Sequence, residues 1–210
     1  MGLTANGHPL DTSSDSFGEL EPLTSLLGDD AALRGAMAEH GHLFFRELLD
    51  PDVVLAARHE ILSKYAILGE VDDRHPIDDA IAGDRAGVAS ANVRAFSHSV
   101  RNGSAYLSVT DHPEVLAVHS ALVGGPARSF DMRWPRFVRP GEGCGFHCDG
   151  PYMNRGTSTL HSSWIPLGRV RRDEGALIVL EGSHRSDALH AGYLDADADR
   201  DGLTWLDSDP

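Results

Sequence analysis

The segment Gly143-Cys144-Gly145-Phe146-His147-Cys148-Asp149-Gly150-Pro151 carries the strongest signal for fold and chemistry in this chain of 210 residues. Its glycines and its proline disfavour a helix, so we predict that His147 to Asp149 lie on a strand or at its end. Side chains alternate between the faces of a strand, so His147 and Asp149 would project to one side while Cys148 points away. An imidazole nitrogen and a carboxylate oxygen placed in this way can share one metal ion. Taken alone, the His-x-Asp pattern is a weak signal, and a structural histidine beside a turn aspartate is its default interpretation.

The same strand geometry decides between two kinds of metal site. A zinc site made of Cys144, His147 and Cys148 needs three side chains on one side, which a helix provides and a strand does not. Extended spacing also places the two cysteine α-carbons roughly 13 Å apart, beyond the limit of about 7 Å for a disulfide. We therefore favour the His147–Asp149 pair over zinc and predict that both thiols stay reduced.

Composition and charge narrow the class of protein. The chain has 18 Lys and Arg against 32 Asp and Glu, and its net charge of −14 repels nucleic acid and anionic membrane surfaces. Hydrophobic residues make up 41%, as in soluble globular proteins. The longest uninterrupted apolar stretch, Ala176 to Leu180, is far shorter than the ~20 residues of a membrane span. Two cysteines and an N-terminus without signal-peptide features predict a cytoplasmic protein with no membrane segment.

The first part of the chain reads as helical. Residues 1–28 are polar and weakly periodic, so we expect a loose arm, followed by a short helix after Asp29 and Asp30 and a strand-like segment from His42 to Leu48. Asp50 and Pro51 are typical of a helix start, and Val54, Ala57, Ile61 and Tyr65 recur on one face of that helix. A further helix is predicted from Pro113 to Val123, closed by Gly124, with a buried stripe formed by Val115, Leu116, His119 and Leu122.

The remaining segments predict a loop and a β-rich region. Residues 69–91 are acidic and rich in small residues, which favours either a lid over a site or a solvated connector. From Ser129 onward, short apolar segments alternate with Gly, Pro and charged turns, a spacing typical of an antiparallel β-sandwich or barrel. The predicted organisation is therefore an arm over 1–28 and one domain over 29–210, helical to about 125 and a barrel from about 126.

Downstream motifs extend the His-x-Asp pattern into an ordered series. After His147-Cys148-Asp149-Gly150 come a Trp164-containing strand and the run Glu174-Gly175-Ala176-Leu177-Ile178-Val179-Leu180-Glu181-Gly182-Ser183-His184-Arg185. This series resembles the phytanoyl-CoA dioxygenase family of non-haem iron, 2-oxoglutarate-dependent oxygenases. The resemblance covers roughly residues 32 to 206 and includes the segments His40 to Arg46, Leu49 to Asp52 and His112 to Gly124.

The resemblance implies a mainly β fold with N-terminal helices, in which a double-stranded β-helix, a cupin-like jelly-roll barrel, holds Fe(II). His147 and Asp149 match the first two metal ligands. Trp164 and Met132 match residues that line the site of the cosubstrate 2-oxoglutarate, although ordinary core packing is an equal reading for Met132. Dioxygen and a small organic molecule would be the remaining reactants. His184 matches a histidine that is structural in the family.

After the Gly-Ser-His turn, the sequence does not show two functional residues that the resemblance leads us to expect. The family has a second metal histidine and a cosubstrate arginine late in the barrel, whereas the only histidine here after His184 is His190. We therefore expect this chain to be the N-terminal part of an oxygenase, with a barrel that is incomplete at its C-terminus, an exposed apolar interior, weak iron binding and no activity of its own.

Two alternatives remain open from the sequence. One is a non-catalytic jelly-roll binding or interaction protein, and the other is a cupin that uses another metal. The substrate is equally open, because four arginines near the metal segment fit either an anionic ligand or a solubilising role. These are Arg94, Arg133, Arg136 and Arg155.

Overall fold

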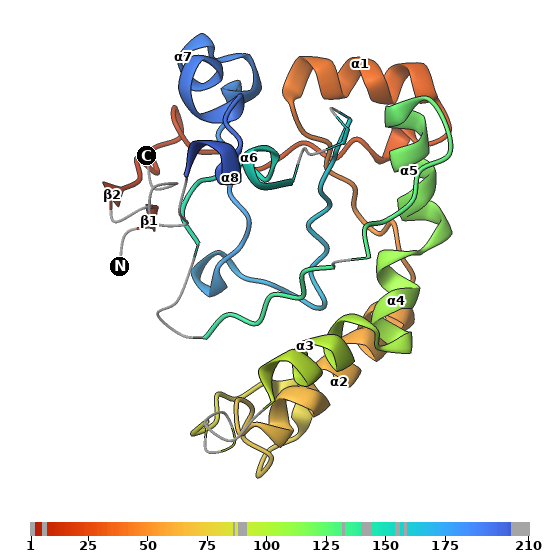
Figure 1. Ribbon diagram of the computed structural model, residues 1–210, viewed down its shortest axis with the longest axis vertical. Coiled ribbons are helices and arrows are strands. Elements are labelled where there is room, and N and C mark those ends of the chain that lie inside the picture. The colour runs from red at the N-terminus through yellow and green to blue at the C-terminus, as the bar shows by residue number, and fades with distance from the viewer. Residues whose placement is uncertain are drawn as a thin grey trace. The chain divides into compact units, whose positions relative to one another are not determined.

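Figure 1 shows the computed structural model of the protein, which describes residues 3–5, 8–85, 87, 92–131, 133–139, 144–153, 156–157 and 159–202. Its backbone contacts divide the chain into two compact units. One unit comprises Arg46–Glu142 and Ile165–Glu174, and the other comprises Met1–Phe45, Gly143–Trp164 and Gly175–Pro210. The predicted limits of the arm and the domain, 1–28 and 29–210, stay predictions.

The unit of residues 46–142 and 165–174 is built from helices. Its elements are α2 (Pro51–Ile67), η2 (Ile77–Asp79), α3 (Val93–Arg101), α4 (Ser104–Thr110), α5 (Pro113–Val123) and η4 (Arg172–Glu174). Figure 1 shows α3 and α4 running alongside α2. Ile61 of α2, Val100 of α3 and Tyr106 of α4 form the centre of the core between these helices.

The sequence predicted α2 and α5 correctly. At the start of α2, the Asp50 side chain accepts a hydrogen bond from the Asp52 backbone N–H at 2.8 Å, and Pro51 occupies the first helical position. Helix α5 spans Pro113–Val123 and ends at Gly124, whose φ of 70° is the left-handed conformation that glycine adopts readily. Of its predicted stripe, Val115 is buried, whereas Leu116, His119 and Leu122 are half-buried.

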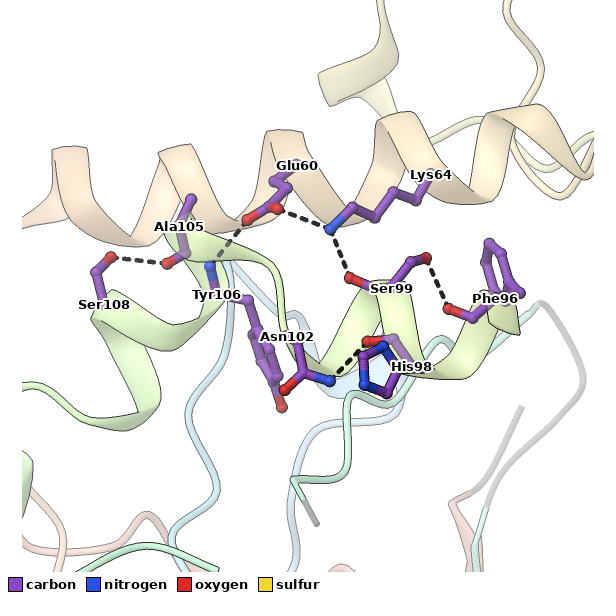
Figure 2. A network of polar contacts seen from close by, with 9 residues as sticks. All are labelled: Glu60, Lys64, Phe96, His98, Ser99, Asn102, Ala105, Tyr106 and Ser108. Atoms are coloured by element: carbon purple, nitrogen blue, oxygen red, sulfur yellow. Dashed lines mark hydrogen bonds and ion pairs between the residues drawn. The ribbon is translucent and has the colours of Figure 1, made fainter. Parts of the chain in front are cut away.

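An ion pair on α2 joins the ends of the two neighbouring helices (Figure 2). Glu60 accepts hydrogen bonds from Lys64 at 2.7 Å and from the Tyr106 backbone N–H at 3.0 Å, in the first turn of α4. Lys64 in turn donates to the Ser99 carbonyl in the last turn of α3 at 2.8 Å. Gly103, the N-cap of α4, leaves room for this contact, because a Cβ there would lie 2.2 Å from Glu60 Oε1.

The second unit contains one longer helix and several short elements. These are β1 (Thr4–Ala5), β2 (His8–Pro9), η1 (Thr24–Leu26), α1 (Asp30–His40), α6 (Gly150–Met153), η5 (Ser183–Arg185), α7 (Asp187–Leu189), η6 (His190–Leu194) and α8 (Ala198–Asp201). Helix α1 confirms the prediction of a helix after Asp29, whose side chain accepts from the Ala32 N–H at 2.9 Å. The strand-like interpretation of His42 to Leu48 is wrong, since this segment contains no strand.

The predicted mainly β jelly-roll barrel is not found in the described part of the chain. Its only sheet pairs β1 with β2 in antiparallel orientation, and one isolated bridge joins Val71 and Ala82. The segments 133–139, 159–166 and 176–180 run without helix or ladder. A strand is defined by hydrogen bonds to a neighbouring strand, and these segments have no such partner among the described residues. The barrel inferred from the apolar spacing is therefore wrong.

The predicted loop over 69–91 is folded back on itself in its described part. The Asp72 N–H donates to the Ile81 carbonyl at 2.8 Å, and the Gly83 N–H donates to the Glu70 carbonyl at 2.9 Å. Glu70 is only 6% exposed and pairs with Arg139 at 2.6 Å and Arg85 at 3.0 Å. Residues 86 and 88–91 lie outside the described residues, and the role of a lid stays a prediction.

Along the part of the chain that the structure describes, no helix combines the length and the apolar character that a bilayer crossing requires.

Candidate functional site

His147 and Asp149 lie side by side immediately before α6. His147 Nε2 and Asp149 Oδ1 are 3.7 Å apart, and the two side chains are 23% and 34% exposed. The predicted strand at this position is wrong, because residues 144–149 form neither strand nor helix. The two side chains nevertheless face one another, and both are accessible to a small ligand.

The other ring nitrogen of His147 is directed away from Asp149. Nδ1 lies 2.9 Å from the Gly145 carbonyl oxygen and 3.6 Å from Cys144 Sγ. A carbonyl only accepts hydrogen bonds, so this contact places the imidazole proton on Nδ1. The lone pair of the neutral ring is then on Nε2, the nitrogen on the side of Asp149.

The carboxylate of Asp149 is oriented by Ser162. The Ser162 hydroxyl donates a hydrogen bond to Asp149 Oδ2, which leaves Oδ1 as the oxygen facing His147. Sequence reasoning did not identify Ser162. Ser162 stands two residues before Trp164, and residues with this spacing lie on the same face of an extended segment. This spacing was the signal that could have identified it.

Tyr193 of η6 was also missed by sequence reasoning. Its phenol oxygen accepts a hydrogen bond from the Cys148 N–H at 3.1 Å and donates to the Cys148 carbonyl at 3.4 Å. Burial raises the pKa of Tyr193, so the phenol keeps the proton that it donates. The contact joins residues 45 positions apart in the chain, and no local pattern announces it.

The two cysteines form no disulfide, as predicted. Burial, with a smaller contribution from the charge of Asp149, raises the pKa of the Cys148 thiol. Cys144 lies on the Nδ1 edge of His147, while Asp149 lies on the Nε2 edge. One metal ion cannot bind both nitrogens of the same ring, so Cys144 and Asp149 cannot join His147 around a single ion.

The His147–Asp149 pair fits two positions of a metal ion. Two donors at about 2.1 Å on adjacent positions of one ion are about 3 Å apart, and a small rotation of either side chain closes the observed 3.7 Å to that value. A neutral imidazole and a carboxylate are also two of the three donor groups in the facial site of non-haem iron oxygenases. Within the described residues, no group of three His, Cys, Asp or Glu side chains is arranged to hold a metal.

The roles predicted for the remaining candidates stay predictions. Trp164 is 47% exposed, and its predicted contact with a cosubstrate stays a prediction. Met132 and Arg155 lie outside the described residues. Arg133 pairs with Asp111 at 2.5 Å, and the Arg136 guanidinium lies 4.9 Å from the centre of the Trp134 ring. Arg94 lines an open cavity of about 510 Å³ with His98 and Arg101 along α3.

Comparison with known proteins identifies one matching family and two similar proteins. The model of the family described as phytanoyl-CoA dioxygenase (PhyH) matches residues 37–209. The 1-deoxypentalenic acid 11-beta-hydroxylases of Streptomyces arenae and Streptomyces exfoliatus are 26% and 25% identical to this chain over 184 residues. Each alignment covers 82% of this chain and 60% of the relative, so the chain spans about three fifths of the length of these proteins. No solved structure matches the chain.

Proposed function

Because this chain belongs to the phytanoyl-CoA dioxygenase family, we propose that it carries two ligands of the Fe(II) centre of a 2-oxoglutarate-dependent oxygenase. His147 and Asp149 are those ligands. The observation that supports the assignment is the 3.7 Å approach of His147 Nε2 to Asp149 Oδ1, with the other polar atom of each side chain engaged elsewhere.

The proposed reaction is the hydroxylation of a small organic molecule. One dioxygen, one 2-oxoglutarate and a substrate C–H bond would give the alcohol, succinate and carbon dioxide. Fe(II), when bound, would supply the electrons that activate dioxygen. Trp164 and Met132 are proposed to line the cosubstrate site.

The residues around the pair have defined tasks in this proposal. The Gly145 carbonyl holds the proton on Nδ1 of His147 and so presents Nε2 as a donor. Ser162 fixes Oδ2 of Asp149 and so presents Oδ1. With the two donors found among the described residues, the ion would be held weakly, because the facial site uses three.

The substrate class is proposed from the relatives. Both are named as hydroxylases of 1-deoxypentalenic acid, a carboxylic acid. A small organic acid is therefore the first substrate to test.

Metal titration tests the ligand pair directly. Mn(II), which resists oxidation, replaces Fe(II) as the probe and is titrated into the wild-type chain, His147→Ala and Asp149→Asn. Asn keeps the shape of Asp and an acceptor for Ser162 but removes the charge. We expect weak binding to the wild type and at least about tenfold weaker binding to both variants. The exposed helical variant His98→Ala is the matched control and should bind as the wild type does.

Two outcomes would contradict the proposal. Equal Mn(II) affinity in the wild type and both ligand variants would show that the ion sits elsewhere. In the full-length gene product, succinate formation from 2-oxoglutarate that survives His147→Ala would remove the pair from the reaction. Absence of any dependence on 2-oxoglutarate would instead favour a cupin with another metal.

A further inference from the structure

The peptide of Cys148 is held by a single side chain. Tyr193 Oη accepts from the Cys148 N–H at 3.1 Å and donates to the Cys148 carbonyl at 3.4 Å. Both bonds thus go to the one residue between His147 and Asp149. The tyrosine comes from η6 (His190–Leu194), which packs against α6 directly after Asp149.

This pair of hydrogen bonds defines the backbone conformation at Cys148. The N–H and C=O of one residue point to the same side only when the backbone is extended, whereas in a helix they point in opposite directions along the axis. The Tyr193 hydroxyl therefore takes the place that the backbone of a neighbouring strand would occupy. It stabilises one extended residue where no strand exists.

An extended residue has a direct effect on its two neighbours. The side chains at positions i−1 and i+1 project to the same side of an extended residue i. His147 and Asp149 are those neighbours, and their donor atoms are 3.7 Å apart. If the Cys148 peptide rotated, the two side chains would diverge.

We propose that Tyr193 is a positioning residue, which sets the spacing of His147 and Asp149 for a divalent metal through its two hydrogen bonds to the Cys148 peptide. The assignment rests on the proposed function of that pair. Tyr193 makes no contact with the metal and acts only through the backbone. Removal of the hydroxyl should therefore change the free energy of metal binding more than it changes the free energy of unfolding.

Tyr193→Phe tests the proposal, because it keeps the ring and removes only the hydroxyl. We expect Mn(II) to bind about tenfold more weakly than to the wild type, the magnitude typical of groups that orient metal ligands. Tyr193→Gln, whose amide both donates and accepts, should restore part of the affinity. Tyr65→Phe, in the other unit, is the matched control and should bind as the wild type does.

The Mn(II) affinities of the variants distinguish the proposal of the His147–Asp149 ligand pair from the proposal of a positioning role for Tyr193. If His147→Ala does not change Mn(II) affinity in the wild-type background, the ligand pair itself is wrong. If His147→Ala weakens binding but Tyr193→Phe binds as the wild type does, the ligand pair stands and the role of Tyr193 is overturned. Thermal unfolding of each variant ensures that affinities are compared between folded proteins.

A measurement on the wild type covers the case in which Tyr193→Phe does not fold. Binding at the pair must stabilise the extended peptide, because coupling between two equilibria is reciprocal. Saturation with Mn(II) should therefore slow hydrogen exchange of the Cys148 amide, followed by mass spectrometry of a peptide that contains residues 144–153. Exchange that is unchanged by Mn(II) would overturn the proposal.

Discussion

Gly41 shows how one residue joins two distant segments within its unit. It follows α1 with a φ of 74°, and its α-carbon faces the His184 ring so closely that a Cβ would lie 2.2 Å from His184 Nδ1. His184 Nε2 is 3.3 Å from the Ala38 carbonyl in the last turn of α1. The histidine of the Gly-Ser-His turn thus packs on the end of a helix more than 140 residues earlier.

Gly41→Ala is expected to lower the free energy of unfolding more than the same change at another helix end. Gly124 also ends a helix with positive φ, but a Cβ there meets nothing within 4 Å. Gly124→Ala should therefore cost only the backbone strain, about 1 kcal/mol. Gly41→Ala adds the displacement of His184 and should cost roughly 2–4 kcal/mol in urea denaturation.

The double variant Gly41→Ala/His184→Ala tests the cause of the difference. Without the ring, the added Cβ has room, so the further cost of Gly41→Ala should fall to that of Gly124→Ala. Costs of Gly41→Ala and His184→Ala that simply add would contradict the packing argument, because additivity means that the two residues do not interact.

At the residue scale, the candidate site could be predicted only in part. The proximity of His147 and Asp149 could be predicted because their spacing in the chain is local, and period-two alternation brings such residues to one side. Tyr193 could not be found, because its contact spans 45 residues and depends on how η6 packs against α6. A tyrosine hydroxyl that hydrogen-bonds to a peptide far away in the chain produces no recognisable pattern in the local sequence.

At the element scale, Glu60 and Lys64 serve as caps for helices other than their own. Gly103 begins α4 without a capping side chain, and Glu60 of α2 supplies the missing acceptor to the Tyr106 N–H (Figure 2). Lys64 supplies a donor to the last turn of α3. Burial raises the pKa of Glu60, but the hydrogen bonds from Lys64 and Tyr106 outweigh that effect and leave the pKa below its ordinary value.

Glu60→Gln is expected to destabilise the helical unit in a manner that depends on pH. The loss should be about 1–2 kcal/mol at pH 7, since a helix cap is weakened and an amide NH₂ then faces Lys64. A carboxyl group with a lowered pKa in the folded state stabilises the fold above its unfolded pKa, here the ordinary 4.5. Its contribution disappears as pH falls through the folded pKa.

Denaturation curves of wild type and Glu60→Gln between pH 7 and pH 3 measure this effect. The difference between the two proteins should be constant above about pH 5 and should shrink below 4.5. Glu39→Gln, an exposed glutamate on α1, is the control and should change stability by less than about 0.5 kcal/mol. A difference that stays constant down to pH 3 would contradict a role for the Glu60 charge.

Elements were predictable where their signals are local. Asp50, Pro51 and Gly124 specify the ends of α2 and α5 by contacts within a few residues. The barrel strands were not predictable in the same way, because a strand needs a partner that no local pattern provides. Segment 133–139 keeps the alternation of a strand: Arg133 and Phe137 point inward, while Trp134 and Val138 are half-exposed. The alternating exposure of a strand is present in this segment, but hydrogen bonds to a neighbouring strand are not found among the described residues.

At the scale of the whole molecule, this alternation leaves apolar side chains in water. Among the described residues, the segments that were expected to form strands expose several large apolar side chains, while others, such as Ile67 and Val93, lie on or beside helices. The exposed side chains of the expected strand segments include Phe130, Trp134, Val138, Trp164, Leu177 and Leu180. Large apolar side chains exposed to water promote association. The chain should therefore bind hydrophobic dyes and associate at high concentration, despite the net charge of −14 that opposes association.

The double variant Leu177→Gln/Leu180→Gln is expected to reduce both dye binding and light scattering. Each leucine is more than half exposed, at 51% and 55%, so the two changes should alter the free energy of unfolding by less than about 0.5 kcal/mol each. Leu33→Ala provides the opposite case: its side chain is 2% exposed, so it should cost roughly 2–5 kcal/mol and increase dye binding. Dye fluorescence, static light scattering and urea denaturation of the three proteins give the comparison. A double variant that unfolds as readily as Leu33→Ala would mean that Leu177 and Leu180 are buried in solution.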